Sequence, residues 1–329
     1  MTMKILVVGG AGYIGSHTVS ELLKKGYEVL VFDNLSSGHK EAVECPLVEG
    51  DLLNKKQIEK VFENQKIDGV VHFAALSAAG ESMKEPGRYF ENNLQGGINL
   101  LEAMKKFGVN RIVFSSSCAI YGYPEKLPVN EEEDKKPVSV YGETKLMFEK
   151  ILYWYDQLFG IKSVSLRYFN AAGASLDGSI GEDKRPLTNI IPVAMKVVLG
   201  QQEKFTLFGD DYPTPDGTCI RDYVHVLDLA EAHIKALDYL FKENESNQFN
   251  VGTGRGYSNK EVLEMIKRVT GVDFKIEVGS RRPGDPAAIF ADNSKIKRIL
   301  GWEPKYSGLE TIIETAWNWH KNHPQGFAK

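Results

Sequence analysis

Short apolar runs alternate with amphipathic stretches through the first half of the chain. Runs rich in branched and aromatic residues predict strands at Ile5–Val8, Glu28–Phe32, Val70–Phe73, Arg111–Ser115 and Ser163–Arg167. Apolar residues at helical spacing predict helices at Ser16–Lys25, Lys55–Asn64, Asn92–Phe107 and Tyr141–Phe159. Strands that alternate with helices are typical of a parallel sheet covered on both faces. We therefore predict an α/β fold with a doubly wound parallel sheet of the Rossmann type.

The alternation stops after Phe169. Residues 170–222 contain much of the proline and glycine, which predicts mainly loops there. Helical patterns return at Leu227–Lys242, Asn259–Val269 and Leu309–His320. We expect two domains, residues 1–168 and a smaller mixed α/β domain of residues 169–329, with an approximate boundary that the chain can cross.

Composition excludes several classes of protein. The 329 residues include 40 Lys+Arg and 44 Asp+Glu, and this balance argues against a nucleic-acid-binding surface. The apolar run near the amino end is far shorter than the roughly 20 residues of a membrane span. Three widely spaced cysteines fit neither a disulfide framework nor a zinc site, and the seven histidines form no convincing metal site. We expect a cytoplasmic protein that binds no metal.

Three glycines, Gly9, Gly12 and Gly15, follow the first strand and open the first helix. In this context glycines allow a tight turn, and the exposed amides and the positive helix end favour a pyrophosphate. Asp33 ends the second strand, where a carboxylate accepts hydrogen bonds from both ribose hydroxyls of NAD. A 2′-phosphate about 4 Å away would be repelled by roughly 4 kcal/mol at an intermediate dielectric. The order of strand, glycine turn, helix, strand and acidic residue predicts that the protein binds NAD rather than NADP. Taken alone, the glycines also fit a turn needed only for packing, and Asp33 also fits a turn or cap residue.

Asp51 follows a further candidate strand at Pro46–Gly50. A carboxylate at this position can reach the adenine edge of the dinucleotide, or it can cap the helix that starts near Lys55. The spacing does not separate the two interpretations.

Tyr141 and Lys145 lie four residues apart, on one face of a helix if the helix begins there. A nearby ammonium favours the phenolate form of tyrosine, which makes it a base. Ser117 follows the strand Arg111–Ser115, at the end where parallel sheets bind ligands, and its hydroxyl can pass a proton to the phenolate. The Tyr-x-x-x-Lys spacing also arises by chance, and a serine at a strand end can simply satisfy the backbone.

Longer motifs carry a resemblance over essentially the whole chain. They are GGAGYIGSH at 9–17, VHFAA at 71–75, FSSS at 114–117, LRYFN at 166–170, FGDDYPTPDGTCIRDYVHV at 208–226, RRPGD at 281–285 and HPQG at 323–326. Together they resemble the extended short-chain dehydrogenase/reductase family, and within it the epimerases that act at carbon 4 of UDP-hexoses. The resemblance implies tightly bound NAD, a Tyr141, Lys145 and Ser117 catalytic set, and the interconversion of UDP-glucose and UDP-galactose through a 4-keto sugar. It also implies an NAD-binding domain at 1–168, a UDP-sugar domain at 169–329 and a homodimer formed through the helices at 92–107 and 141–159.

The same resemblance implies the other binding residues. For NAD these are Gly9, Gly12, Tyr13, Ile14, Gly15, Asp33, Asn34, Ser37, Gly38, Asp51, Leu52, Phe73, Ala74, Ala75, Leu76, Asn92 and Phe169, with Tyr141 and Lys145 at the nicotinamide ribose. For the sugar nucleotide they are Asn170, Asn189, Arg221, Arg282 and Asp285, with Ser117 and Tyr141 at the sugar. Arginines suit forked hydrogen bonds to phosphate, although Arg221 and Arg282 could instead form ion pairs with Asp222 or Asp285.

Some positions depart from the family pattern, and others distinguish this chain from related enzymes with a different activity. Ser77 stands where many relatives carry lysine, so we expect no lysine contact from that position, and Ile289 leaves N-acetylated substrates undecided. A sugar-nucleotide 4,6-dehydratase needs an acid pair after the catalytic hydroxyl, but Cys118 and Ala119 follow Ser117. A uronic-acid epimerase or decarboxylase, and a dinucleotide-sensing protein without catalysis, are the remaining alternatives.

Overall fold

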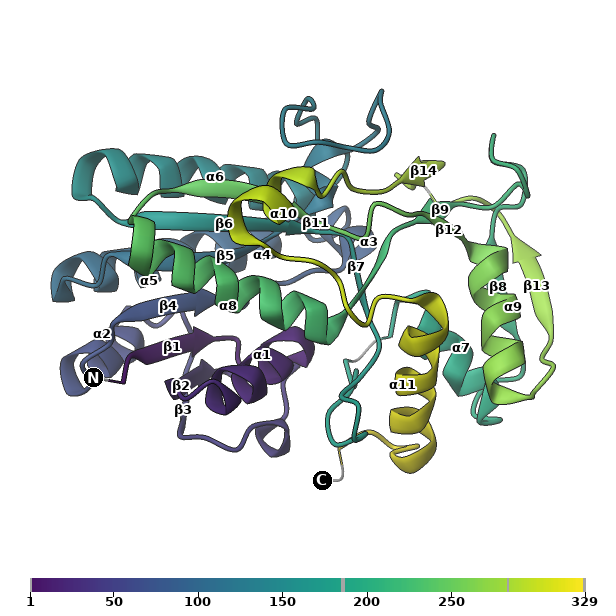
Figure 1. The fold of residues 1–329 in the computed structure, drawn as a ribbon, viewed down its shortest axis with the longest axis horizontal. Coiled ribbons are helices and arrows are strands. Elements are labelled where there is room, and N and C mark those ends of the chain that lie inside the picture. The colour runs from purple at the N-terminus through teal and green to yellow at the C-terminus, as the bar shows by residue number, and fades with distance from the viewer. Residues whose placement is uncertain (1, 185–186, 283, 328–329) are drawn as a thin grey trace.

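A seven-stranded parallel sheet forms the centre of the protein in the computed structural model, which describes residues 2–184, 187–282 and 284–327. Its strands, in spatial order, are β11 (Asn247–Val251), β6 (Lys162–Tyr168), β5 (Arg111–Ser117), β4 (Gly69–His72), β1 (Lys4–Val8), β2 (Glu28–Asp33) and β3 (Leu47–Glu49). All neighbouring pairs are parallel, and helices cover both faces (Figure 1). The predicted doubly wound α/β fold is confirmed.

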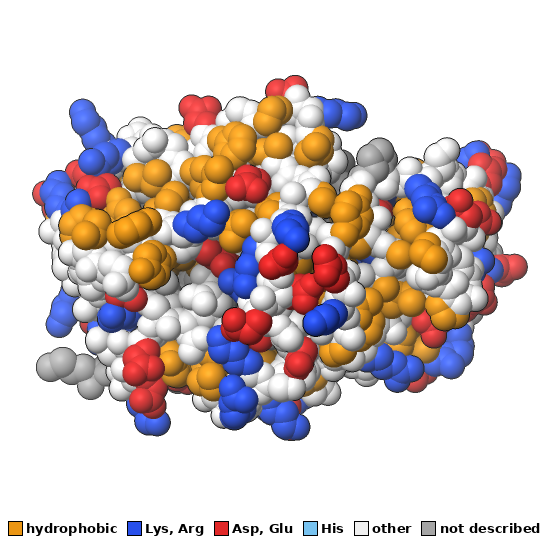
Figure 2. Space-filling view, turned by 90° about the horizontal axis from the view of Figure 1, so that it is seen from above, with side chains coloured by type: hydrophobic (Ala, Val, Ile, Leu, Met, Phe, Trp, Pro, Cys, Tyr) orange, Lys and Arg blue, Asp and Glu red, His pale blue; other side chains and the backbone are white. Residues whose placement is uncertain are grey.

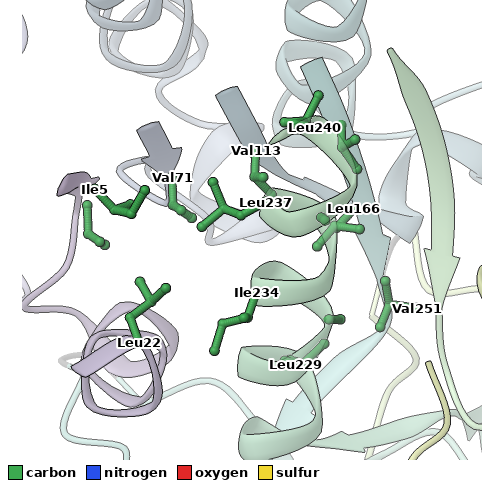
Figure 3. Close-up of a cluster of buried hydrophobic side chains, with 14 of the residues drawn as sticks. Ile5, Leu22, Val71, Val113, Leu166, Leu229, Ile234, Leu237, Leu240 and Val251 are labelled. Carbon is green, nitrogen blue, oxygen red and sulfur yellow. The ribbon is translucent and has the colours of Figure 1, made fainter. Parts of the chain in front are cut away.

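Alternate side chains of these strands supply two cores, one on each face of the sheet. On one face Ile5, Val71 and Leu166 pack against α1 (Tyr13–Lys24) and α8 (Val226–Glu243), as Figure 3 shows. On the other face the intervening residues pack against α2 (Lys55–Asn64), α5 (Gly96–Phe107) and α6 (Val140–Phe159). Strands that are apolar on both faces are what a helix-covered parallel sheet requires.

The helix expected at Asn92–Phe107 forms as α5 preceded by α4 (Pro86–Phe90) and a π-helical turn at Glu91–Gln95. A short helix, α3 (Ala79–Ser82), comes before them. The first helix starts at Tyr13, three residues before its expected start at Ser16, because the glycine turn leads directly into it. Two short 3₁₀ helices, η1 (Lys40–Ala42) and η3 (Cys118–Tyr121), follow β2 and β5.

The rest of the chain forms a smaller unit beyond the carboxyl ends of the sheet strands (Figure 1). Its helices are α7 (Ile190–Val198), α9 (Asn259–Thr270) and α11 (Leu309–Asn322), whereas α10 (Ser294–Leu300) packs on α8 and β11 of the central layer (Figure 1). Its strands are β7 (Asn170–Ala172) with β10 (Tyr223–His225), β8 (Phe205–Phe208) with β13 (Ile276–Gly279), and β9 (Ile220–Arg221) between β12 (Tyr257–Ser258) and β14 (Ala288–Ile289). A separate core joins α7, α9 and α11.

The chain crosses between the two units. It returns from the smaller unit to add α8 and β11 to the central sheet layer, and β11 pairs with β6 from Asn247 to Val251. Residues 170–222, which we expected to be mainly loops, contain α7, β7, β8 and β9. Within the described residues no helix has the length and apolar character needed to cross a membrane.

Candidate functional site

The turn after β1 has the shape that a bound pyrophosphate needs. Gly9 adopts a φ of 79°, and a Cβ on Gly15 would lie 2.3 Å from the Gly9 carbonyl oxygen, so both positions require glycine. A Cβ on Gly12 would meet only the Gly9 oxygen, at 3.4 Å, so the space in front of Gly12 is open. Because α1 begins at Tyr13, its first amides face this space. The turn therefore fits NAD.

Asp33 is tied to this turn by backbone hydrogen bonds. Its Oδ2 accepts from the Ala11 amide and its Oδ1 from the Leu35 amide, each at 2.9 Å. Burial raises the pKa of this carboxyl group, and the two amides oppose that shift. Each carboxylate oxygen still has a second acceptor site, which is what the two ribose hydroxyls of NAD need.

The remaining residues expected around adenosine lie beside Asp33. Asn34 donates to Asp51 Oδ2 at 2.9 Å, and Asp51 Oδ1 accepts from the Leu53 amide at 2.8 Å. Asn54, not Asp51, directly precedes α2, so the interpretation of Asp51 as its N-cap is wrong. Leu52 is 8% exposed and contributes to the core beneath.

The loop after β2 packs on the glycine turn. A Cβ on Gly38 would lie 2.8 Å from the Ala11 carbonyl carbon, and the His39 amide donates to the Ala11 oxygen at 2.9 Å. Ser37 lines a small cavity shared with the turn. The residues around that cavity are Ala11, Gly12, Tyr13, Ser16, Ser37, His39, Gly181, Asp183, Lys184 and Phe327.

Two contacts bring the smaller unit to this cavity. The Tyr13 hydroxyl donates to the Gly173 carbonyl oxygen at 2.6 Å, while Ile14 packs against the sheet core. The Lys184 ammonium donates to the Ser77 hydroxyl at 2.7 Å. The sequence has no lysine at position 77, but the fold brings one to that place from a segment 107 residues away. Sequence reasoning missed Lys184, and no motif indicated it.

Residues 73–76 leave β4 at the same edge of the sheet. The amides of Phe73 and Ala74 both donate to the Val8 carbonyl oxygen, at 2.8 and 3.1 Å. Asn93 binds both the amide and the carbonyl of Leu76, at 2.8 and 3.0 Å. Asn92, which we expect to support the cofactor, donates to Asn93 Oδ1 at 2.9 Å. Asn93 thus holds residues 73–76 in place. In the sequence, its position in an Asn-Asn pair is the one signal that could have indicated this role.

Tyr141 and Ser117 meet where α6 begins. Ser139 caps the helix by accepting from the Gly142 amide at 3.1 Å. A Cβ on Gly142 would lie 2.6 Å from the Ala119 carbonyl oxygen, so this glycine allows α6 to approach η3 closely. The Ser117 hydroxyl accepts from the Ala119 amide at 3.1 Å and hydrogen-bonds the Tyr141 side chain.

Lys145 lies one helical turn further along α6. Its ammonium donates to the Ser115 carbonyl oxygen at 2.7 Å and lies 5.8 Å from the centre of the Tyr141 ring. Burial lowers the pKa of Lys145 to about 7, opposed by Glu149. Burial also raises the pKa of the Tyr141 phenol far above its usual range. The three expected catalytic side chains are therefore together, in a place that disfavours charge.

A second cavity, of about 410 Å³, lies in the smaller unit. Its lining includes Tyr123, Tyr212, Pro213, Arg281, Arg282, Gly284, Asp285 and Ala287. The Arg282 guanidinium lies 4.3 Å from the centre of the Phe208 ring. Arg221 forms the ion pair with Asp285 that the sequence left open, at 3.5 Å, and donates to the Pro286 oxygen at 2.8 Å.

The other expected binding residues line neither of these two cavities. Asn170 donates to the Asp222 carbonyl oxygen at 3.0 Å, and Asn189 donates to Glu182 Oε1 at 2.9 Å. The Phe169 side chain is 5% exposed and packs in a small core cluster that also holds Ile289.

Known proteins resemble the chain along its length. The family model "NAD dependent epimerase/dehydratase family" matches residues 5–252. A UDP-glucose 4-epimerase of Lacticaseibacillus casei is 52% identical over 327 residues, which cover 99% of each chain. A solved UDP-glucose 4-epimerase from Brucella ovis, in complex with NAD, is 46% identical, with a TM-score of 0.93 over 96% of this chain and 98% of that one.

A solved UDP-glucose 4-epimerase from Bifidobacterium longum, in complex with NAD+ and UDP, is 38% identical. It superposes with a TM-score of 0.94 over 99% of this chain and 100% of that one. The family match, the full-length identity and the glycine turn with its acidic partner lead to one conclusion. The chain belongs to the NAD-dependent epimerase/dehydratase family.

Proposed function

We propose that the chain interconverts UDP-galactose and UDP-glucose by inverting carbon 4 of the hexose. The observation that carries this proposal is the meeting of Ser117, Tyr141 and Lys145 at the sheet edge that bears the glycine turn. A separate cavity with Arg282 in the smaller unit can hold a nucleotide diphosphate. The relatives named UDP-glucose 4-epimerase, and the neighbour solved with NAD+ and UDP, support this assignment.

The residues divide the proton chemistry among them. Tyr141 takes the proton of the 4-hydroxyl, with Ser117 in the hydrogen-bond path, and Lys145 stabilises the phenolate by its charge. NAD, when held by the glycine turn and Asp33, would supply the hydride chemistry, as acceptor from carbon 4 and donor to the opposite face of the sugar. Tyr141 then returns its proton to the oxygen at carbon 4, so that no other substrate is consumed. Because burial raises the pKa of Tyr141, its ionisation depends on positive charge held beside it.

The smaller unit holds the nucleotide while the sugar turns. Arg282 is stacked on Phe208, and Arg221 is oriented by Asp285, so both guanidiniums are positioned before a diphosphate arrives. We assign residues 1–168, completed by α8, β11 and α10, to NAD and the rest of residues 169–329 to the UDP-sugar. The 4-keto sugar can then turn about its phosphate linkage while UDP stays in place.

A 4,6-dehydratase needs a pair of acidic residues after the catalytic hydroxyl, and the two positions after Ser117 do not supply them. Burial raises the pKa of the Cys118 thiol to about 12, so it does not replace a carboxylic acid, and Ala119 has no acidic group. Ile289 is 4% exposed and lies in a core cluster with Phe169, so it does not favour either unmodified or N-acetylated sugars. A uronic-acid epimerase or decarboxylase is therefore the alternative that a direct assay must separate.

The experiment is to incubate the purified protein with UDP-galactose, without added NAD, and to measure UDP-glucose. We expect conversion to the same equilibrium mixture from either sugar, and NAD released when the protein is denatured. Turnover of UDP-glucuronate with none of UDP-galactose would contradict the assignment. Bound NAD without any turnover would favour a dinucleotide-sensing protein.

We also propose that the chain forms a homodimer through α6. Four hydrophobic side chains near the carboxyl end of this helix are 47–66% exposed, namely Tyr153, Trp154, Leu158 and Phe159. Figure 2 looks down on the side of the molecule where α6 lies and shows hydrophobic groups gathered at that end. The apolar face of α5, in contrast, is buried within the chain. Light scattering should give a dimer that Trp154→Glu with Leu158→Glu converts to a monomer, and a monomeric parent protein would exclude this interface.

We further propose a cytoplasmic location. The three cysteines are free, which suits a reducing compartment. Fractionation of the source cells should recover the protein with cytoplasmic markers, and recovery with the membrane or the medium would refute this.

A further inference from the structure

A buried ion pair lies directly behind the candidate catalytic residues. Arg167 of β6 clamps Glu149 of α6 with two bonds, from Nε to Oε1 at 3.0 Å and from Nη2 to Oε2 at 2.7 Å. Both side chains are under 9% exposed. An ion pair in this environment is costly to form unless its remaining hydrogen bonds are satisfied, and it contributes little net stability compared with apolar residues. Its presence calls for an explanation other than stability.

The remaining bonds of the pair are satisfied by neighbouring elements. Arg167 Nη1 donates to the Tyr121 hydroxyl at 3.0 Å, and that hydroxyl donates to Asn250 Oδ1 at 2.7 Å. The backbone N–H of Asn250 donates to Glu131 Oε1 at 2.8 Å. Arg167 Nη1 also donates to the Glu131 carbonyl oxygen at 3.3 Å. The guanidinium is thus fixed by η3 and the loop after it, with β11 holding Tyr121, and it holds the Glu149 carboxylate in one orientation.

The carboxylate connects this pair to the catalytic strand and helix. Glu149 Oε1 accepts from the Ser116 hydroxyl at 2.6 Å. Ser116 lies between Ser115, whose carbonyl holds the Lys145 ammonium, and Ser117. Glu149 also lies four residues after Lys145, one turn along the same helix. A single negative charge therefore stands beside the end of β5 and beside the ammonium bound to it.

We propose that Glu149, clamped by Arg167, is a positioning residue that keeps Lys145 charged and bound to the end of β5 beside Tyr141. This inference rests on the proposed role of Lys145 in catalysis. In this proposal Glu149 touches neither the sugar nor the cofactor, and Arg167 acts by holding the Glu149 carboxylate.

The groups around Lys145 show why a negative charge is needed. Tyr141 and Glu149 face it from α6, the Ser115 carbonyl faces it from β5, and His72 lies near it on β4. His72 is buried, and burial together with the Lys145 charge lowers its pKa to about 3, so it is neutral. Glu149 is then the one full negative charge among these groups, and it opposes the loss of the Lys145 proton that burial favours.

The test measures the ionisation of Lys145 itself. Holoenzyme labelled with ¹³C at the lysine ε-carbon is titrated by NMR, and Lys145 is assigned by the signal lost in Lys145→Met. We expect Glu149→Gln to lower the pKa of Lys145 by about one pH unit or more, a tenfold or greater change in its proton affinity. Arg167→Gln removes a positive charge and keeps the Glu149 carboxylate, which the Ser116 hydroxyl still holds, so the pKa of Lys145 should stay the same or rise.

These two substitutions separate electrostatic positioning from simple structural support. A structural role would make both variants disturb Lys145 in the same direction, whereas our proposal requires different responses. Ser116→Ala removes a hydrogen bond but no charge and is the matched control, with unchanged titration expected. If Glu149→Gln does not fold, Glu149→Leu with Arg167→Met replaces the pair by apolar side chains and should fold while still lowering the pKa of Lys145.

An unchanged pKa of Lys145 in Glu149→Gln, or in the double variant, would overturn the proposal. Epimerisation by the parent protein is measured separately. Absence of epimerisation would count against the proposed function, and the NMR titration would still decide the role of Glu149.

Discussion

Replacing Asp33 by asparagine should weaken NAD binding and reduce the preference for NAD over NADP. The native carboxylate accepts one backbone amide on each oxygen, from Ala11 and Leu35, both at 2.9 Å. Asparagine keeps a single oxygen, so its amino group must face one of these N–H groups. The substitution thus changes the glycine turn and the ribose site together, and the two effects must be measured separately.

The geometry gives the size of each effect. Loss of one charge-assisted hydrogen bond that leaves a buried amide unpaired costs about 1.5–3 kcal/mol of unfolding free energy. A neutral acceptor also weakens the bonds to the two ribose hydroxyls by about 2 kcal/mol in total, which lowers NAD affinity roughly 30-fold. A 2′-phosphate about 4 Å away would escape a repulsion of roughly 4 kcal/mol. The ratio of NAD to NADP affinity should therefore fall by at least about 100-fold.

Calorimetric titration of the apoprotein with each dinucleotide measures the ratio, and thermal unfolding measures stability. Asp68→Asn is the matched control, because Asp68 accepts a hydrogen bond from the Lys4 amide at 2.8 Å at the amino ends of β1 and β4, away from the glycine turn. It should lose stability without any change in the affinity ratio. If Asp33→Asn unfolds earlier but keeps the parent ratio, Asp33 is only a structural support for the turn and our reasoning about the ribose fails.

The Tyr141→Phe variant should fold normally and retain NAD, but its turnover of UDP-galactose should fall by about 10²–10⁴-fold. Turnover at the parent rate would exclude Tyr141 as the base. Gly142→Val should lower both stability, by about 1–3 kcal/mol in urea unfolding, and turnover, because a Cβ there lies 2.6 Å from the Ala119 oxygen. Parent-like values would mean that the close approach of α6 is not required. Lys184→Met removes the ammonium bound to Ser77 and should increase NAD loss during gel filtration roughly tenfold, whereas equal NAD content would show that this charge does not reach the cofactor.

Periodicity predicted the strands whose neighbours in the sequence are also neighbours in the sheet. It missed β11, because Asn247–Val251 (NQFNV) is largely polar and gains its apolar surroundings only by pairing with β6. It also missed α7, because Pro192 interrupts the apolar run. Proline is accommodated there because it is the third residue of the helix, where its missing amide has no partner within the helix to lose.

Candidate site residues were predictable where one motif carries both the position and the chemistry, as for Gly9, Asp33 and Tyr141. Asn93 and Lys184 could not be predicted in this way, because each acts through a contact with a distant loop. The hydrogen bond from Tyr13 to Gly173 spans 160 residues, and no local pattern predicts such a partner. Residues whose chemistry and position come from one motif can be predicted from the sequence. The contacts that fix the geometry of the site depend on the tertiary fold and cannot.

The division of the site between two units that we propose has a consequence for catalysis. In this proposal the dinucleotide end is fixed by backbone amides around Asp33, and the nucleotide end has guanidiniums fixed by Phe208 and Asp285. A sugar that must present both faces to one cofactor needs rigid attachments at these ends and freedom between them. Changes at Arg282 should therefore act mainly on KM, and changes at Tyr141 mainly on kcat. Equal effects of both substitutions on kcat would mean that the nucleotide end does more than anchor the substrate.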